Sequence, residues 1–246
     1  MKSKLFAYAS ICFGQVKNTI IVASIFLGLL GRPIQASEAY WLDQHNALFY
    51  LSTFQLDNQL KEMNKEGAKT LLLHADALPS LISRFIAWRA KEVGNMKSIA
   101  WIQKPNKDNL RHAARLVGFN GVQIDDHYFN NPPISLSELR VMLGEKELWC
   151  SFQPRQFSHN IADTCDQNDV QIYRNTCKGT GDLAWKMGIT GKQHIAVAAY
   201  HDGSKQGTEL IKCIKQDLKG LGTKLFVFKW KNQEAIIKHL LPQFSK

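Results

Sequence analysis

Residues 118–129 read Gly-Phe-Asn-Gly-Val-Gln-Ile-Asp-Asp-His-Tyr-Phe, an apolar run that ends abruptly in two acids, an imidazole and two aromatic rings. Burying a charged group is costly unless the group is paired or used. A strand that ends in Asp125, Asp126 and His127 therefore indicates a site at the mouth of a sheet. A solvated loop or a helix cap is the plainer interpretation, and the sequence on either side has to decide between the two.

The alternation of apolar and amphipathic segments along the chain favours the site. From residue 47 onward, short apolar runs alternate with stretches of helical periodicity. The expected strands are 47–52, 70–75, 98–103, 121–125, 147–153, 170–175, 194–200 and 223–228. The expected helices are 56–66, 81–93, 109–117, 136–143, 208–221 and 233–241, with weaker helical signals before 168 and at 183–187.

This alternation predicts a parallel sheet, because parallel neighbours need a crossover and the crossover is usually a helix. Eight such units in this length predict a single small (β/α)8, or TIM, barrel. A doubly wound open sheet is the alternative. No strand–helix junction carries GxGxxG or GxxxxGK[ST], so we expect no nucleotide and no other cofactor.

The N-terminal part of the chain reads differently from the rest. Basic residues precede an uncharged run at 19–31, and small residues follow it up to Ala39. That order predicts a secretory signal peptide over 1–39, cleaved after Ala36 or Ala39, with the barrel at 40–246. An uncleaved anchor through 19–31 is the alternative, although this run is short for a span of about 20 residues. We therefore expect an exported protein, periplasmic or extracellular.

Charge and cysteine content limit the classes of partner and metal. The net charge is +10, but the basic residues are scattered among acids at helical spacing. Nucleic-acid binding is therefore not expected, and membrane contact is expected only through an uncleaved N-terminal segment. Four cysteines follow the leader, which permits disulfides in an exported chain. Cys165 and Cys177 flank one short segment and are the preferred pair. The absence of metal-ligand spacing predicts no metal site.

In a (β/α)8 barrel the carboxyl ends of all strands meet at one mouth, where catalytic groups lie. The residues after the predicted strands are therefore candidates for one shared site. Besides Asp125, Asp126 and His127, they are Ser52, Thr53, Gln55, His74, Asp76, Gln103, Lys104, Gln153, Arg155, Tyr173, Arg174, Asn175, Tyr200, His201, Asp202, Lys229 and Trp230. Strand alternation predicts that Gln123, Asp125 and His127 point into the barrel.

Two of these segments resemble a known family. The run Gly-Val-Gln-Ile-Asp-Asp-His at 121–127 is similar to the fourth-strand element of glycoside-hydrolase-type barrels, in particular the glycosyl-hydrolase-like family 10 group common in cyanobacteria. The run Val-Gln-Ile-Tyr-Arg-Asn at 170–175 resembles a sixth-strand element there, with Asn175 where an acid is usual. A looser similarity to family 18 chitinases puts His127 where their catalytic Glu stands, which speaks against chitinase-type chemistry. The resemblance implies a barrel that acts on or binds a polysaccharide.

Glycoside hydrolysis normally uses two carboxyl groups, one protonating the leaving oxygen and one acting as base or nucleophile. We expect Asp125 to be the principal acid/base, with its pKa raised by a neighbouring aspartate, and Asp126 or Asp76 to be its partner. Aromatic candidates are expected to stack on sugar rings, and polar candidates to bind hydroxyls or an acidic substituent. These substrate-binding candidates are His74, His127, Gln153, Arg155, Tyr173, Arg174, Tyr200, His201, Asp202 and Trp230.

Two other functions remain open at this point. No Glu follows a predicted strand, which favours a noncatalytic barrel that binds glycans without cleaving them. A phosphodiesterase-like barrel would use His74 and His127 as acid and base. Plainer structural roles also exist, among them an ion pair between Asp126 and Arg155 and a hydrogen-bonded core position for His74.

Overall fold

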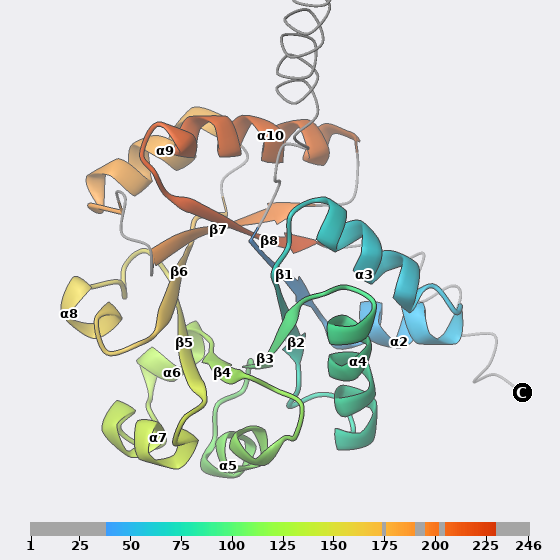
Figure 1. Cartoon of the computed structure of the whole chain (residues 1–246). Helices are drawn as coiled ribbons and strands as arrows, with labels where there is room; N and C mark the ends of the chain where they lie inside the picture. The colour runs from blue at the N-terminus through green and yellow to red at the C-terminus, as the bar shows by residue number, and fades with distance from the viewer. Residues whose placement is uncertain (1–37, 174–175, 190–194, 202–204, 230–246) are drawn as a thin grey trace, which may run out of the picture. The chain divides into compact units, whose positions relative to one another are not determined.

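Eight parallel strands form a closed barrel in the computed structural model, which describes residues 38–173, 176–189, 195–201 and 205–229 (Figure 1). The strands follow one another in chain order, and the last pairs with the first, where Ala39 is the register partner of Phe226. The predicted (β/α)8 barrel is confirmed. The strands are β1 (Ala39–Leu42), β2 (Thr70–His74), β3 (Lys97–Ile102), β4 (Gly121–Ile124), β5 (Glu147–Phe152), β6 (Gln167–Gln171), β7 (Ile195–His201) and β8 (Lys224–Lys229).

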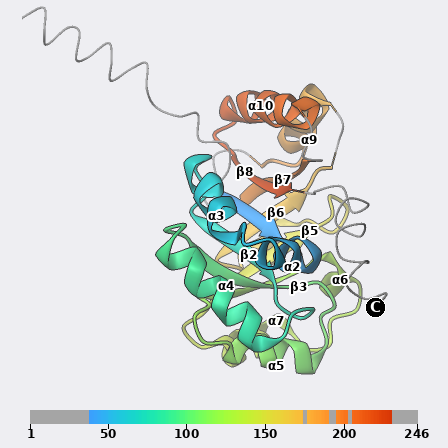
Figure 2. The same cartoon turned by 90° about the vertical axis from the view of Figure 1, so that its right-hand side faces the viewer.

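Helices follow the strands and lie on the outside of the barrel, as Figure 1 shows along the barrel axis. Turned by 90°, α3 and α4 lie in front of the neighbouring strands (Figure 2). The helices are α2 (Gln44–Ser52), α3 (Leu56–Lys65), α4 (Ser80–Glu92), α5 (Lys107–Arg115), α6 (Asp126–Asn130), α7 (Leu136–Leu143), α8 (His159–Ala162), α9 (Cys177–Lys186) and α10 (Lys205–Lys219).

The alternation of side chains along each strand produces two separate apolar clusters. Outward residues such as Leu71, Val122 and Leu148 pack under the helices in the larger cluster. The smaller cluster fills the barrel interior and is dominated by aromatic rings; its buried members are Ala39, Trp41, Leu72, Ile99, Trp101, Trp149, Ala196, Ala198 and Phe226. Trp149 and Phe226 stack there with ring centroids 5.6 Å apart.

The predicted first strand, 47–52, is wrong. That segment belongs to α2, which Asp43 caps by accepting hydrogen bonds from the backbone N–H groups of His45 at 2.8 Å and Asn46 at 2.9 Å. The actual first strand, β1, has only four residues and precedes this cap. A short apolar run does not by itself separate a strand from a buried helical turn. The expected strand-end candidates Ser52, Thr53 and Gln55 therefore lie at the end of a helix.

The predicted sixth strand is placed too late in the chain. β6 begins at Gln167 and ends at Gln171, whereas the prediction ran from 170 to 175. The strand thus starts with polar residues, Gln-Asn-Asp, the first two of which fall in the segment expected to be weakly helical up to 168. The glycine-rich region after it forms α9 over ten residues, longer than the helical turn expected at 183–187.

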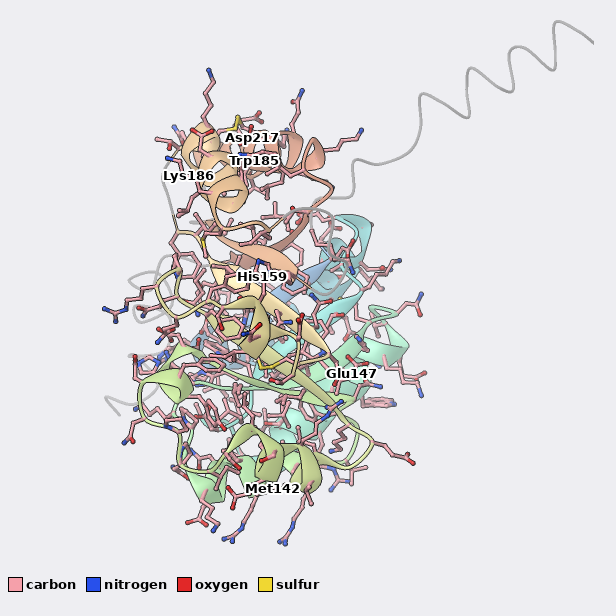
Figure 3. All side chains as sticks on the ribbon, turned by 90° about the vertical axis from the view of Figure 1, so that its left-hand side faces the viewer. Met142, Glu147, His159, Trp185, Lys186 and Asp217 are labelled. Carbon is pink, nitrogen blue, oxygen red and sulfur yellow. A yellow bond between two sulfur atoms is a disulfide. The ribbon has the colours of Figure 1, made fainter. Side chains whose placement is uncertain are left out.

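The preferred disulfide between Cys165 and Cys177 is also wrong. Cys150 of β5 bonds to Cys165, and Cys177 of α9 bonds to Cys213 of α10. Figure 3 shows these two helices side by side, with Trp185 of α9 and Asp217 of α10 labelled. Sequence proximity favoured the wrong pair because it does not report which residues the crossovers bring together. Two disulfides are typical of proteins from oxidising compartments.

Residues 1–37 of the predicted signal segment, with its run at 19–31, lie outside the described residues, as does the helix expected at 233–241. Ala39 is fully buried and already part of β1, and the backbone N–H of Glu38 donates to the carbonyl of Leu225 at 3.2 Å. Cleavage after Ala36 would leave β1 whole, whereas cleavage after Ala39 would remove its first residue. Among the described helices, none combines the length and the apolar character needed to cross a membrane.

Candidate functional site

Asp125 stands where β4 ends and α6 begins. Its side chain is 6% exposed and caps α6 by accepting the backbone N–H of Asp126 at Oδ1, over 2.8 Å. Gln171 Nε2 of β6 donates to the same oxygen at 2.8 Å, and Trp101 Nε1 of β3 donates to Oδ2 at 3.2 Å. Side chains from β3 and β6 thus converge on one buried carboxyl group that follows β4 at the mouth of the barrel.

The environment of Asp125 changes its protonation. Burial, and after it the neighbouring charge of Asp126, raise the pKa of Asp125 to about 6. Hydrogen bonds donated by the backbone of Asp126 and by Trp101 act in the opposite direction but are weaker. A carboxyl group that titrates near neutral pH can serve as a general acid, because it still holds a proton when an ordinary aspartate has lost it.

Asp126 is the second buried carboxyl group at this point, with 5% exposure. Gln153 donates a hydrogen bond from Nε2 to Oδ2 of Asp126, and Nδ1 of His127 lies 3.0 Å from Oδ1. These partners replace the ion pair with Arg155 that was considered as its plainer role. Asp126 is therefore held at the mouth by a neutral amide and an imidazole.

His127 does not point into the barrel, so that prediction is wrong. β4 ends at Ile124, and from Asp126 onward the chain is helical, so the two-residue alternation of a strand no longer applies. The side chain of His127 is 61% exposed and bonds to Asp126. The predicted inward direction of Gln123 is confirmed, since its side chain bonds to Trp41 and Asp169 inside the barrel.

Among the described residues, Asp125, Asp126 and His127 also form a group that could hold a metal ion. One potential ligand atom from each lies within 4.8 Å of the others. The oxygens concerned already accept hydrogen bonds from Gln171, Gln153 and the α6 backbone. Because these contacts explain the cluster, we assign no ion to it.

A cavity of about 640 Å³ opens beside this pair, at the carboxyl ends of β5 and β6. Arg155 and Tyr173 line it, and Tyr173 is 49% exposed. Two further lining residues, Gln153 and Gln171, are the amides that bond to Asp126 and Asp125. The two aspartates bond to these amides but are not among the lining residues of the cavity. The remaining lining residues are Pro154, Ile172 and Leu183.

His74 and Asp76 form a separate pair at the end of β2. His74 Nε2 lies 3.0 Å from Asp76 Oδ1, and both side chains are buried. Burial alone would raise the pKa of Asp76, but hydrogen bonds from His74 and from the backbone N–H groups of Lys104 and Gln103 lower it below its ordinary value. Asp76 thus joins the end of β2 to the loop after β3.

The sequence did not point to a polar chain in the barrel interior. It consists of Gln123, Ser151, Asp169 and Gln171, and it reaches Asp125 at one end and Trp41 at the other. Asp169 is fully buried on β6. Extending the predicted sixth strand back by three residues would have put Asp169 on the same face as Gln171, and this is the signal that could have found it.

Several predicted site residues cannot be placed by their side chains. Arg174, Asp202 and Trp230 lie outside the described residues. Tyr200 and His201 belong to β7, but only their backbone is described. Of the predicted residues that can be placed, the structure brings Asp125, Asp126, His127 and Gln153 into direct contact. It leaves His74 and Asp76 as a second group. Trp101 joins this group to the first, because its ring contacts the His74 ring with centroids 4.5 Å apart and its indole N–H bonds to Asp125.

No family model and no curated protein matches the chain. Among solved structures, an active-site mutant of Rhizomucor miehei β-1,3-glucanosyltransferase in complex with laminaritriose is similar, with a TM-score of 0.55 and 8% identity over 80% of this chain and 87% of that one. The glycoside hydrolase family 17 β-1,3-glucanosyltransferase from the same organism gives a TM-score of 0.53 at 9% identity, again over 80% of this chain and 87% of that one. The tryptophan synthase complex of Pyrococcus furiosus gives 0.50 at 12% identity, over 86% of this chain and 92% of that one.

At such low identities these similarities show the TIM-barrel fold alone. The fold supports many unrelated reactions, and the neighbours themselves act in different chemistries. The predicted resemblance to glycoside-hydrolase-type barrels is therefore supported at the level of the fold.

Proposed function

We propose that this protein is a glycoside hydrolase that acts on a polysaccharide, with Asp125 and Asp126 as the two carboxyl groups of the reaction. The observation that carries the proposal is the juxtaposition of two buried aspartates, with oxygens within 4.8 Å of each other, one of which has its pKa raised to about 6. Such a pair can hold one proton and one negative charge near neutral pH, which is what acid-assisted cleavage of a glycosidic bond needs.

In this proposal Asp125 is the general acid. It donates its proton to the glycosidic oxygen while the bond between that oxygen and the sugar carbon breaks, and it becomes a carboxylate. Gln171 and Trp101 donate hydrogen bonds that stabilise the resulting charge. Asp126 is the carboxylate that acts on the sugar carbon, either directly or through a water molecule. We leave Asp76 out of the reaction because His74 and two backbone N–H groups already occupy its oxygens.

The cavity beside the pair is the proposed position of the sugar chain. Tyr173 offers a half-exposed ring for stacking, and the exposed Arg155 offers donors for hydroxyl groups or for an acidic substituent. Gln153 and Gln171 line the cavity and bond to the two aspartates, so substrate would displace or share their hydrogen bonds. We further propose that the protein is exported, which agrees with its two disulfides.

The phosphodiesterase-like alternative gains nothing from the geometry. Each imidazole is bonded to its own aspartate, and His74 is buried whereas His127 is mostly exposed. A glycan-binding barrel without activity is the remaining competitor, and it shares the cavity and its lining residues.

The decisive experiment is a polysaccharide screen with purified wild type and Asp125→Asn, followed by reducing-end release. Laminarin-type β-1,3-glucans belong in the screen because laminaritriose is the ligand of the fungal neighbour. Asp108→Asn is the matched control, since Asp108 on α5 has a side chain 92% exposed. We expect turnover by wild type and Asp108→Asn and its loss, by at least about 100-fold, in Asp125→Asn. Equal turnover by all three would overturn the role of Asp125. Binding without turnover by wild type would establish the noncatalytic barrel instead.

A further inference from the structure

Asp169 is a buried carboxyl group that the proposed reaction does not use. It is fully buried on β6, and its register partners are Ser151 of β5 and Ala196 of β7. Burying an aspartate among the aromatic rings of the barrel interior costs free energy unless hydrogen-bond donors reach its oxygens. Both of its oxygens are satisfied, Oδ1 by Ser151 Oγ at 2.7 Å and Oδ2 by Gln123 Nε2 at 2.7 Å.

We infer that Asp169 is a positioning residue that acts through Ser151 to fix the side-chain amide of Gln171, and thereby the Asp125 carboxyl group. The inference rests on the proposed role of Asp125 as the reacting acid. It goes beyond that role because it assigns a task to a group that lies deeper in the barrel than the site itself.

The direction of each hydrogen bond in the chain is determined by chemistry. Trp41 Nε1 can only donate, and it does so to Gln123 Oε1 at 2.8 Å. The Gln123 amide must therefore turn its NH2 group toward Asp169. At the other end, the Gln171 NH2 group lies 2.8 Å from Asp125 Oδ1 and 2.9 Å from Ser151 Oγ, so both of its N–H bonds have acceptors. The amides of Gln123 and Gln171 therefore each have one possible orientation, with the NH2 group toward Asp169 in the first case and toward Asp125 and Ser151 in the second.

Ser151 is the link that transmits the constraint. Its hydroxyl accepts from Gln171 and donates to Asp169, so the orientation of the Gln171 amide depends on a serine that Asp169 holds in place. Burial raises the pKa of Asp169 well above its ordinary value, although Ser151 and Gln123 both donate to it. Because a serine hydroxyl both donates and accepts, the link persists whether Asp169 carries a proton or a charge.

A purely space-filling role fits the surroundings poorly. On the neighbouring strand, the partners of Asp169 and Gln171 are Ala196 and Ala198, two small residues on an interior face that also carries three buried tryptophans and Phe226. This arrangement leaves room for two long or polar side chains in line between β5 and β7. Apolar residues of similar size would fill the same volume at no desolvation cost, so the polar chain has a use other than packing.

The titration of Asp125 is a direct readout of this positioning, and several groups bear on it. The titratable groups near Asp125 are Asp126 and His127 on α6, Asp169 on β6, and His74 on β2, whose ring contacts the Trp101 ring that donates to Asp125. Gln171 and Trp101 are the neutral donors. A variant that loosens only Gln171 removes a donor to the charged form and must move the titration toward higher pH.

The test compares Ser151→Ala, Asp169→Ala and Asp169→Asn with wild type. Ser98→Ala is the matched control, because Ser98 is a buried strand serine whose hydroxyl has no hydrogen-bond partner within the described part of the chain. The carboxyl carbons of aspartate are labelled with ¹³C, and the Asp125 signal is identified by its loss in Asp125→Asn. Titration is followed by NMR without substrate, so the result does not depend on finding an activity.

We expect Ser151→Ala to increase the proton-association constant of Asp125 by about fivefold, the worth of one hydrogen bond. Asp169→Ala and Asp169→Asn both remove a carboxyl group that repels the Asp125 charge, so these two variants are compared with each other. The constant should be about fivefold higher in Asp169→Ala than in Asp169→Asn, since the amide can accept from Gln123 and donate to Ser151, and Ser98→Ala should be unchanged. If Asp169→Ala does not fold, Ser151→Ala still carries the test. A wild-type titration in Ser151→Ala would overturn the inference. Full turnover by Asp125→Asn together with the shifted titrations would refute the proposed reaction and leave the positioning role intact.

Discussion

Trp101 donates a hydrogen bond from its indole Nε1 to Asp125 Oδ2 over 3.2 Å, inside the mouth of the barrel. This bond favours the charged form of Asp125 and lowers a pKa that burial raises. Trp101→Phe keeps an aromatic ring but removes the donor. We expect the Asp125 carboxylate to lose about 1–2 kcal/mol of stabilisation, so its titration should move to higher pH. Trp149→Phe is the control, because the indole of Trp149 bonds to Glu147 at the other end of the barrel interior. Equal titrations in wild type and Trp101→Phe would show that the contact has no electrostatic effect.

Stability should depend on pH through Asp125 in a defined direction. Its folded-state pKa of about 6 lies above that of an unfolded aspartate, so its contribution is fully present below about pH 4 and is lost as the pH rises through 6. The free energy of unfolding of wild type relative to Asp125→Asn should therefore fall by up to about 3 kcal/mol between pH 4 and pH 7.5. Urea unfolding of both proteins at the two pH values measures this difference. A difference that stays constant would contradict the raised pKa.

Asp76 should show the opposite dependence. Its pKa is lowered in the folded protein, so its contribution is present above the unfolded value and is lost as the pH falls through the folded one. Asp76→Asn places an NH2 group where one oxygen now accepts from His74 or from a backbone N–H, and we expect it to cost about 1–3 kcal/mol at neutral pH. Thermal unfolding at pH 7 and pH 3 should show the penalty shrinking in acid. An activity loss without any stability loss would instead return Asp76 to the list of reacting groups.

The two disulfides close loops of different length and should stabilise accordingly. Their sequence separations are 15 residues for Cys150–Cys165 and 36 for Cys177–Cys213. Loop-closure entropy predicts about 3 and about 4 kcal/mol respectively, which double Cys→Ala variants of each pair would lose. Peptide mapping of the unreduced protein should recover both crosslinks. Recovery of a Cys165–Cys177 peptide would show that the pairing differs.

Gly121 opens the strand that carries the site and permits a close approach to β5. A Cβ atom at this position would lie 2.9 Å from the Glu147 Cβ and would press against the Glu147 carbonyl oxygen, both on the paired strand. We expect Gly121→Ala to destabilise the protein by about 1–3 kcal/mol, measured by urea unfolding. Gly220→Ala is the control, since the nearest atom to its Cβ would be at an ordinary 3.6 Å. A neutral Gly121→Ala would mean that β4 and β5 can separate without loss of pairing.

The fold could be predicted because most strands carry a continuous apolar run and most helices end at a glycine. The strands at 70–75, 98–103 and 121–125 differ from β2, β3 and β4 by a residue or so at either end. The first strand failed because the apolar residues of 47–52 are helical, and the cap at Asp43 that starts this helix was not recognised. Four residues of β1 contain too little pattern to compete with it.

Only the residues of the candidate site that directly follow a strand could be predicted. Asp125 and Asp126 follow an obvious strand, so their position at the mouth could be expected. Asp169 escaped because its strand begins with three polar residues, and polarity at the start of a strand resembles a loop. The cysteine pairing depended on contacts between crossovers, which local spacing does not encode. For Asp169 and for the cysteines alike, the sequence does not show which residue of a neighbouring element is the partner.

Cys150 and Ser151 are neighbours on β5, and alternation sends one outward to its disulfide and the other inward to the polar chain. β5 therefore carries the Cys150–Cys165 disulfide on its outer face and, on its inner face, the serine that orients Gln171 against Asp125. Before oxidation, β5 has its ladder of backbone hydrogen bonds but no covalent tie to the segment that leads into β6. For the proposed function we therefore expect the protein with Cys150 and Cys165 reduced to align its site less well, and to turn over more slowly, than the oxidised protein.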